Sequence, residues 1–306
     1  MTRAPSLWKF GGLSMWDLAK LTYKKMSADE LSTRSAALSY YFLLALFPML
    51  LFLLSLVAFV AGPGSQMRDT IVSAMGRLAP GAASSLIHGV VQQTFRASGG
   101  LKLAAGIVGA LWAASGGMSA VVSSLNVIYR TTETRPWWKQ KFVVVALTVA
   151  LAVLIILALV LVLYGGKIGA TVASHIGLGH IFDTAWDVVQ WPVALGAMFM
   201  AFSLIYYFGP DVKNRTWHWV SPGAVTGVVL WLAASIGFRV YLHFFNRYSA
   251  TYGSLGAVVI LLLWLYFTGY AILIGDELNW VIENGGKEDT ELRGRARGIQ
   301  ENLNAA

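Results

Sequence analysis

Six apolar segments, each close to or beyond the length needed to cross a lipid bilayer, constrain this chain of 306 residues more than any other feature. An α-helix rises about 1.5 Å per residue, so about 20 apolar residues span a hydrocarbon core of about 30 Å. The segments cover residues 36–61, 101–129, 142–164, 192–208, 220–245 and 255–274, and the fourth is the shortest. The sequence therefore predicts an all-α polytopic membrane protein with six transmembrane helices plus amphipathic interfacial helices.

Composition agrees with this class of protein. Hydrophobic residues make up 57% of the chain and charged residues only 12%, whereas about a quarter of the residues in an ordinary soluble domain are charged. The chain has no cysteine, which excludes a disulfide framework, a thiolate metal site and a thiol nucleophile. No cleavable signal peptide is expected, because the first apolar segment continues as a full span.

The distribution of lysine and arginine predicts the orientation. If the N-terminus is cytoplasmic, most of the 23 basic residues fall on the cytoplasmic side of the six segments. By the positive-inside rule, both termini are then expected in the cytoplasm. The net charge of +8 is read as topology and contact with anionic membrane lipids, and no nucleic-acid partner is expected.

Residues 1–33 are predicted to form a cytoplasmic interfacial amphipathic helix, ahead of a transmembrane domain over residues 34–284. Capping-box patterns at Ser14 with Asp17 and at Ser27 with Glu30 predict a helix that breaks near Ser27 and restarts. Helical spacing puts one set of side chains opposite a set of lysines: Leu18, Leu21, Thr22 and Met26 against Lys20, Lys24 and Lys25.

Three further segments lie outside the spans. Residues 65–98 carry two amphipathic patterns split by a Pro-Gly breaker, which predicts an outer helical hairpin, with a surface loop of two helical turns as the alternative. Residues 167–190 are too polar to span and are expected to form an outer connection with some helix. Residues 285–306 have low hydrophobicity and mixed charge, which predicts a disordered cytoplasmic tail.

Small residues recur every four positions in the second segment and again in the fifth. This spacing lets helix backbones approach closely, so both ridges are predicted to face neighbouring helices. The residues are Ala105, Gly109, Ala113 and Gly117, followed by Gly223 and Gly227. Pro48 removes a backbone donor inside the first segment and is expected to kink it, either as a structural bend or beside a pathway.

The sequence contains no residue pattern typical of an enzyme active site. The five histidines show no metal-ligand spacing, and Asp276 and Glu277, adjacent on a helix, point about 100° apart. No catalytic, cofactor-binding or metal-binding residue is predicted. Instead, the level of Asp276 and Glu277 matches that of Arg34 and Arg130, which predicts a cytoplasmic ion-pair cluster that ties helices together or gates a path.

Three cations are expected at outer-leaflet depth without an acidic partner. Arg239, Lys102 and Lys167 either extend to ordinary lipid phosphates or form a binding site for an anionic headgroup. The sequence places no carboxylate near the bilayer midplane, which disfavours a proton- or sodium-coupled pump and favours lipid translocation.

Four stretches resemble the YihY/BrkB family of bacterial inner-membrane proteins, and the resemblance covers about residues 34–284. They are RSAALSYYFLLALFP (34–48), SSLNVIYR (123–130), W-x-W-V-x-PGA (217–224) and YGSLGAVVILLLWLYFTGYAILIGDELNW (252–280). The resemblance implies six transmembrane helices, and it links some members to envelope integrity, resistance to killing and export of lipid A precursors. Asp276 departs from the family motif G-x-E-L-N, which usually has a small residue there.

The resemblance also brings the label ribonuclease BN, which these residues do not support, because RNA hydrolysis requires a metal cluster or a paired acid and base. The sequence instead predicts transport or flipping of a lipid or other anionic amphiphile. The alternative is a non-catalytic membrane scaffold of an envelope assembly. The expected partners are membrane lipids, with envelope proteins and a second copy of the chain left open.

Overall fold

The computed structural model describes residues 7–61, 100–176, 179–213, 217, 219–244, 256 and 258–284. The chain divides into two compact units. The first unit comprises Met1–Tyr40, Val121–Arg135 and Met198–Ala306, and the second comprises Tyr41–Ala120 and Pro136–Ala197. Every regular element among the described residues is a helix, which confirms the all-α prediction.

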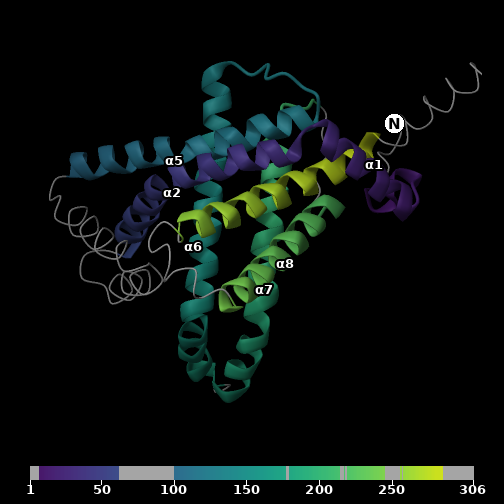
Figure 1. Cartoon of the computed structure of the whole chain (residues 1–306). Helices are drawn as coiled ribbons and strands as arrows, with labels where there is room; N and C mark the ends of the chain where they lie inside the picture. Colours follow the sequence, from purple (N-terminus) through teal and green to yellow (C-terminus); the bar gives the residue numbers. More distant parts are fainter. Residues whose placement is uncertain are drawn as a thin grey trace, which may run out of the picture. The chain divides into compact units, whose positions relative to one another are not determined.

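Each apolar segment lies wholly or largely within one of the helices drawn in Figure 1. They are η1 (Leu7–Gly12), α1 (Met15–Ala28), α2 (Leu31–Ala61), α5 (Gly100–Ile128), α6 (Trp137–Ile176), α7 (Gly179–Phe208), α8 (Pro222–Phe244) and a C-terminal helix, Val258–Asn284. Within the described residues, five stretches are long and apolar enough to cross a membrane: Ala105–Ile128, Trp137–Ala158, Val188–Phe208, Pro222–Tyr241 and Val258–Asn284. The first predicted segment lies in α2, which is 31 residues long.

Three boundaries differ from the sequence prediction. Pro192, the predicted start of the fourth segment, lies inside α7, which already begins at Gly179. Residues 167–190 are helical over most of their length, because α6 continues to Ile176 and α7 starts at Gly179. The C-terminal helix runs on past residue 274 to Asn284, so Asp276 and Glu277 lie within it. The predicted hairpin at 65–98 and the tail at 285–306 lie outside the described residues.

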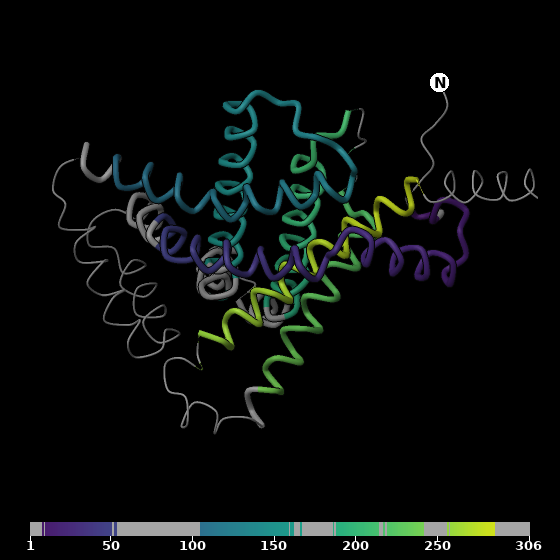
Figure 2. The backbone as a smooth tube through the Cα atoms, turned by 45° about the horizontal axis from the view of Figure 1, so that its top comes forward, coloured from purple at the N-terminus to yellow at the C-terminus, as the bar shows by residue number. Residues whose placement is uncertain are grey.

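In the first unit, the C-terminal helix packs closely against α8 (Figures 1 and 2). A Cβ atom added to Gly275 would lie 2.5 Å from the backbone oxygen of Gly223, and one added to Gly223 would lie 2.5 Å from the side-chain oxygen of Asn279. Trp231 donates a hydrogen bond to Thr268 at 3.2 Å further along the same pair of helices. The helices therefore run antiparallel with their backbones almost in contact, as small residues permit in a membrane.

The end of α7 completes this packing. The Tyr206 hydroxyl donates to the backbone oxygen of Ile272 at 2.8 Å, and a Cβ on Gly227 would meet the Phe202 ring at 2.7 Å. Gly223 and Gly227 thus face neighbouring helices, as their spacing indicated. A buried face of α5, formed by Val121, Val122, Leu125 and Ile128, belongs to the same unit.

In the second unit, only one end of the small-residue ridge on α5 makes a close helix contact among the described residues. A Cβ on Gly117 would lie 3.1 Å from Ala45 Cβ on α2. Ala105 and Ala113 are exposed, and a Cβ on Gly109 would meet no described residue within 4 Å. Four-residue spacing identifies a ridge of small residues. It does not show how much of the ridge is covered by a neighbouring helix. Pro48 lies inside α2, which continues beyond it, and the predicted kink stays a prediction.

The N-terminal helix forms largely as predicted. Ser14 caps α1 by accepting a hydrogen bond from the Asp17 backbone at 3.1 Å. The second capping box does not form, because Ser27 lies within α1 and Glu30 takes a positive φ of 53° in the turn before α2. Lys25, expected on the polar face, is instead buried together with Leu18 and Thr22.

Candidate functional site

A buried ion pair joins α1 to the C-terminal helix in the first unit. Lys25 Nζ lies 2.8 Å from Glu277 Oε1, and the side chains of Lys25 and Glu277 are only 6% and 0% exposed. Lys25 also pairs with Asp29 one turn later in the chain. We call the group formed by Lys25, Asp29, Tyr129, Asp276, Glu277 and Trp280 the Glu277 cluster.

The end of α5 supplies a third ligand to the Lys25 ammonium. α5 ends in a Schellman turn, in which Arg130 and Thr131 donate backbone hydrogen bonds to Val127 and Asn126. Arg130 takes the left-handed conformation of this turn, with φ of 51°. The backbone oxygen of Ile128 accepts a hydrogen bond from Lys25 Nζ at 2.9 Å. Lys25 therefore fixes the end of α5 as well as the C-terminal helix.

Trp280 covers the cationic side of the Glu277 cluster. Its ring centre lies 4.1 Å from Lys25 Nζ and 5.3 Å from the Arg130 guanidinium carbon, both within the range of a cation–π contact. Tyr129 donates a hydrogen bond to Asp276 Oδ1 at 3.3 Å. Asp276 and Glu277 therefore contact different partners, as adjacent residues on a helix must.

The structure changes the predicted pairing within this cluster. The cation against Glu277 is Lys25, and neither Arg34 nor Arg130 takes that place. Arg34 Nε donates to the backbone oxygen of Asp29 at 2.9 Å, while Arg130 stacks on Trp280. Sequence reasoning missed Lys25 because a lysine on an amphipathic helix was assigned to the polar face. Its register with Leu18 and Thr22, at helical spacing, was the available signal.

Asn279 ties the next turn of the C-terminal helix to the start of α8. Ser221 caps α8 by accepting from the Ala224 backbone at 3.0 Å, and Pro222 occupies the first helical position. Asn279 accepts from the Gly223 backbone at 2.9 Å and donates to the Ser221 hydroxyl at 3.0 Å. The Asn279 side chain thereby hydrogen-bonds a free backbone N–H and the capping hydroxyl at the start of α8.

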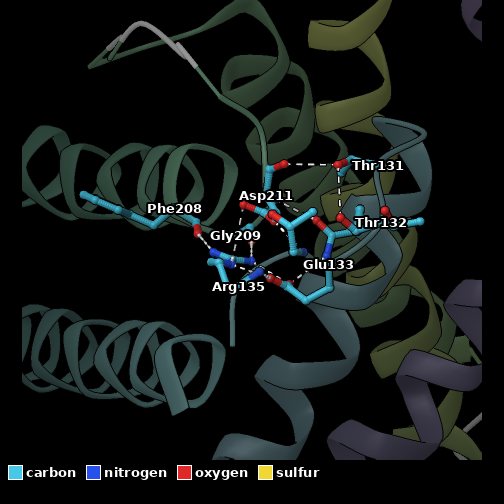
Figure 3. Close-up of polar contacts among 9 residues, drawn as sticks. Thr131, Thr132, Glu133, Arg135, Phe208, Gly209 and Asp211 are labelled. Atoms are coloured by element: carbon cyan, nitrogen blue, oxygen red, sulfur yellow. Dashed lines mark hydrogen bonds and ion pairs between the residues drawn. The ribbon is translucent and has the colours of Figure 1, made fainter. Parts of the chain in front are cut away.

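A second polar group joins the turn after α5 to the end of α7, also within the first unit (Figure 3). Arg135 binds both carboxylate oxygens of Glu133, with Nε 2.6 Å from Oε1 and one terminal nitrogen 2.8 Å from Oε2. The same guanidinium donates to the backbone oxygens of Phe208 at 3.3 Å and Gly209 at 2.9 Å. Arg135 therefore places a cation at the C-terminus of α7, where the helix dipole favours it.

Asp211 and Asn126 complete this Arg135 network. Asp211 Oδ2 accepts from the Thr134 backbone at 2.7 Å, and the Asp211 backbone donates to Asn126 Oδ1 at 2.8 Å. Asn126 in turn donates to Glu133 Oε2 at 3.0 Å. Nothing in the sequence pattern alone pairs these two loops, since the contacts join residues far apart in the chain.

The Arg135 network keeps its carboxylates ionised. The hydrogen bond from Arg135 holds the pKa of Glu133 below its ordinary value, against the opposing effect of burial. Burial also opposes ionisation of Asp211, but hydrogen bonds from Thr134 and the charge of Arg135 leave the pKa of Asp211 lowered. The pKa of Arg135 is raised, chiefly by its hydrogen bond to Glu133.

These lowered pKa values predict that the hydrogen bonds between the two loops of the Arg135 network are lost in acid. Stabilisation by a carboxylate with a lowered folded pKa is complete above the ordinary pKa of about 4 and disappears as the pH falls through the folded value. We expect the hydrogen-exchange protection of the Thr134 amide, corrected for intrinsic rate, to hold from about pH 7 to 5 and to fall below about pH 4. The Ala224 amide, bound to the neutral Ser221 hydroxyl, is the control. Loss of both protections at one pH would contradict a local effect.

The described residues do not test the predicted grouping of the three outer cations. Arg239 lies on α8 and is exposed. Lys102 and Lys167 belong to the second unit, and their side chains are not described, so the predicted grouping stays a prediction. Within the described residues, no group of three or more His, Cys, Asp or Glu side chains could hold a metal ion.

Comparison with known proteins places the chain in a family. The model of the family described as virulence factor BrkB matches residues 22–299. The ribonuclease-like protein YfkH of Bacillus subtilis (strain 168) is 35% identical over 268 residues, which is 88% of this chain and 96% of the relative. A UPF0761 membrane protein of Vibrio vulnificus (strain YJ016) is 29% identical over 291 residues, covering 88% of this chain and 87% of the relative.

No solved structure matches the chain. The family match nevertheless extends from α1 through the C-terminal helix, and so includes the residues of both the Glu277 cluster and the Arg135 network. Since the match covers most of the chain, and YfkH is aligned over nearly its whole length, the chain belongs to the BrkB/YihY family of multi-pass membrane proteins.

Proposed function

We propose that the protein moves a lipid or other anionic amphiphile across the bacterial inner membrane for the cell envelope. The observation that carries this proposal is Arg239, an exposed arginine inside the candidate span Pro222–Tyr241. Ile236 and Val240 beside it are exposed apolar side chains, so the guanidinium lies on a helix face suited to lipid.

The position of Arg239 explains why an anionic group would bind there. It lies about 25 Å along α8 from Pro222, near the far end of a stretch about as long as a bilayer core is thick, which corresponds to outer-leaflet depth. A charged side chain in hydrocarbon is costly unless it is paired, and a phosphate offsets that cost. The planar guanidinium can bind two phosphate oxygens at once, which a lysine cannot do.

The test is lipid movement in liposomes that contain the purified protein. The fluorescent probe is phosphatidylglycerol labelled on its headgroup, and dithionite bleaches the probe molecules in the outer leaflet. We expect faster loss of the protected fraction with the wild-type protein than in empty liposomes. Arg239→Gln should slow lipid movement about tenfold, the effect of losing one charged hydrogen bond. Arg239→Lys should give an intermediate rate, because lysine keeps the charge but loses the bidentate geometry.

The same experiment tests the alternative function. Equal movement by the wild type and Arg239→Gln would remove Arg239 from the mechanism. Wild-type liposomes that behave like empty ones, with protein shown to be folded and inserted, would contradict transport and favour a scaffold of an envelope assembly. Envelope proteins and a second copy of the chain would then be the partners to seek.

The proposal includes no catalysis and no nucleic-acid partner. The name of YfkH describes a ribonuclease-like protein. Hydrolysis of RNA requires a metal cluster or a paired acid and base, and neither the Glu277 cluster nor the Arg135 network offers an exposed pair of this kind. Cleavage of labelled RNA by the purified protein would overturn the proposal that it is not a ribonuclease.

We further propose that α2 is a sixth span and that both termini are cytoplasmic. α2 is 31 residues long and covers the first apolar segment, and an even number of spans fits the distribution of lysine and arginine. A single cysteine replacing Asn302 in this cysteine-free chain should react with a membrane-impermeant maleimide only after the cells are broken. Labelling of intact spheroplasts would place the C-terminus outside.

A further inference from the structure

Lys141, near the start of α6 in the second unit, is held in one position by two neighbours on α5. Its Nζ donates to the Ser115 hydroxyl at 2.6 Å and lies 4.0 Å from the ring centre of Trp112. Ser115 is completely buried and donates its own proton to the Trp112 backbone oxygen at 2.6 Å. The Ser115 oxygen is therefore oriented to accept from Lys141.

This arrangement positions a cation without neutralising it. A lysine ammonium has three N–H donors, and Ser115 accepts from one of them. Neither Lys141 nor Lys139, whose Nζ lies 5.3 Å from the Trp138 ring centre, has an acidic partner within the described residues. The remaining donors of Lys141 are available to a ligand that carries negative charge.

The start of α6 is unusually positive for a helix N-terminus. Helix dipoles favour acidic side chains in the first turn and disfavour cations there. The first turn of α6 contains no acidic residue, and Lys139 and Lys141 both lie within the first five residues. The Lys141 ammonium and the positive end of the dipole thus belong to the same end of α6, which an anion would stabilise.

The surroundings are apolar and exposed. Trp112, Trp138 and Phe142 are 58%, 55% and 72% exposed, and Trp137 is exposed beside them. Tryptophan is enriched where hydrocarbon meets headgroups, because its ring suits both environments. A soluble anion would leave these side chains in water, whereas a lipid would cover them with its glycerol and acyl chains.

We infer that Lys141 and the start of α6 bind the phosphate of an acidic phospholipid headgroup, with Trp112 and Trp138 flanking the lipid. The fixed ammonium distinguishes this site from a lysine that extends freely to any phosphate. The inference does not depend on transport, since a bound lipid can be structural or regulatory.

The test is lipid retention by the purified, full-length protein in native mass spectrometry. Phosphatidylglycerol and phosphatidylcholine with the same acyl chains are added in turn. We expect the wild type to retain phosphatidylglycerol selectively, and Lys141→Gln to retain about tenfold less, the effect of losing one charged hydrogen bond. Ser115→Ala should weaken retention less, because the ammonium keeps its charge but loses its orientation. Lys141→Arg should retain selectivity.

Lys213→Gln is the matched control, because it removes the same charge from an exposed position in the first unit. Equal loss of phosphatidylglycerol by Lys213→Gln and Lys141→Gln would overturn the site in favour of general charge attraction. Equal retention of the two lipids by the wild type would also overturn it, and so would glycerol phosphate competing as well as the lipid. If Lys141→Gln fails to fold, Ser115→Ala, compared with Lys141→Arg, carries the same test.

Liposome transport separates this inference from the proposed function. Normal lipid movement by Lys141→Gln together with lost retention would confirm a binding site outside the translocation step. Lost movement by Arg239→Gln with normal retention would support the proposed function and leave the Lys141 site unaffected.

Discussion

Replacing Gly223 by alanine is expected to destabilise the protein by about 3 kcal/mol, the upper end of the usual cost of overpacking a core. An added Cβ would clash with the Gly275 backbone, and rotating a side chain cannot relieve a clash with a backbone atom. The helix start held by Asn279 would also have to move. The measurement is unfolding in mixed micelles with increasing sodium dodecyl sulfate, followed by tryptophan fluorescence.

Gly109→Ala is the matched control for this prediction. Both substitutions change a helical glycine to alanine, but a Cβ on Gly109 meets no described residue within 4 Å. The control should therefore be neutral or slightly stabilising, by about 0.5–1 kcal/mol, since alanine is the better helix former. Equal stability of the two variants would contradict close packing of α8 on the C-terminal helix.

Lys25→Met is expected to cost about 3–5 kcal/mol, because it leaves the Glu277 charge buried without its cation. The exposed neighbour Lys24 supplies a control, and Lys24→Met should change stability little. The decisive variant combines Lys25→Met with Glu277→Gln. Removing the charge together with its partner should recover much of the loss, and the same unfolding measurement gives the coupling energy. Strict additivity of the two single changes would rule out a direct pair.

The helices could be predicted from the sequence because each depends on a local property. A run of apolar residues long enough to cross a bilayer has to form a helix there, since a helix satisfies its own backbone hydrogen bonds. The cap at Ser14 likewise depends on neighbours three residues apart. These features required no knowledge of which helix lies beside which.

The contacts of the site depend on which helices are neighbours in space, and the predictions failed where they required this information. The sequence placed a cation near Glu277 but chose Arg34 and Arg130, because they lie at the same level at the ends of predicted spans. Lys25 lies on an amphipathic helix, where a lysine is expected on the polar face. The spacing of small residues marked both the Gly109 and the Gly223 ridges, although only the second is enclosed at every marked position among the described residues. The Arg135 network joins two polar loops that have no periodic pattern.

The Lys25 pair also sets an order of events during synthesis. Lys25 precedes every candidate span, whereas Glu277 lies in the last one. At about 5–20 residues per second, the ribosome needs on the order of tens of seconds between the two residues. Throughout that interval α1 has left the ribosome without Glu277. Of the other partners of Lys25, Asp29 is made within the next turn and Ile128 only with α5. The N-terminal helix is therefore among the first elements made and among the last to dock, so the final helix closes the first unit.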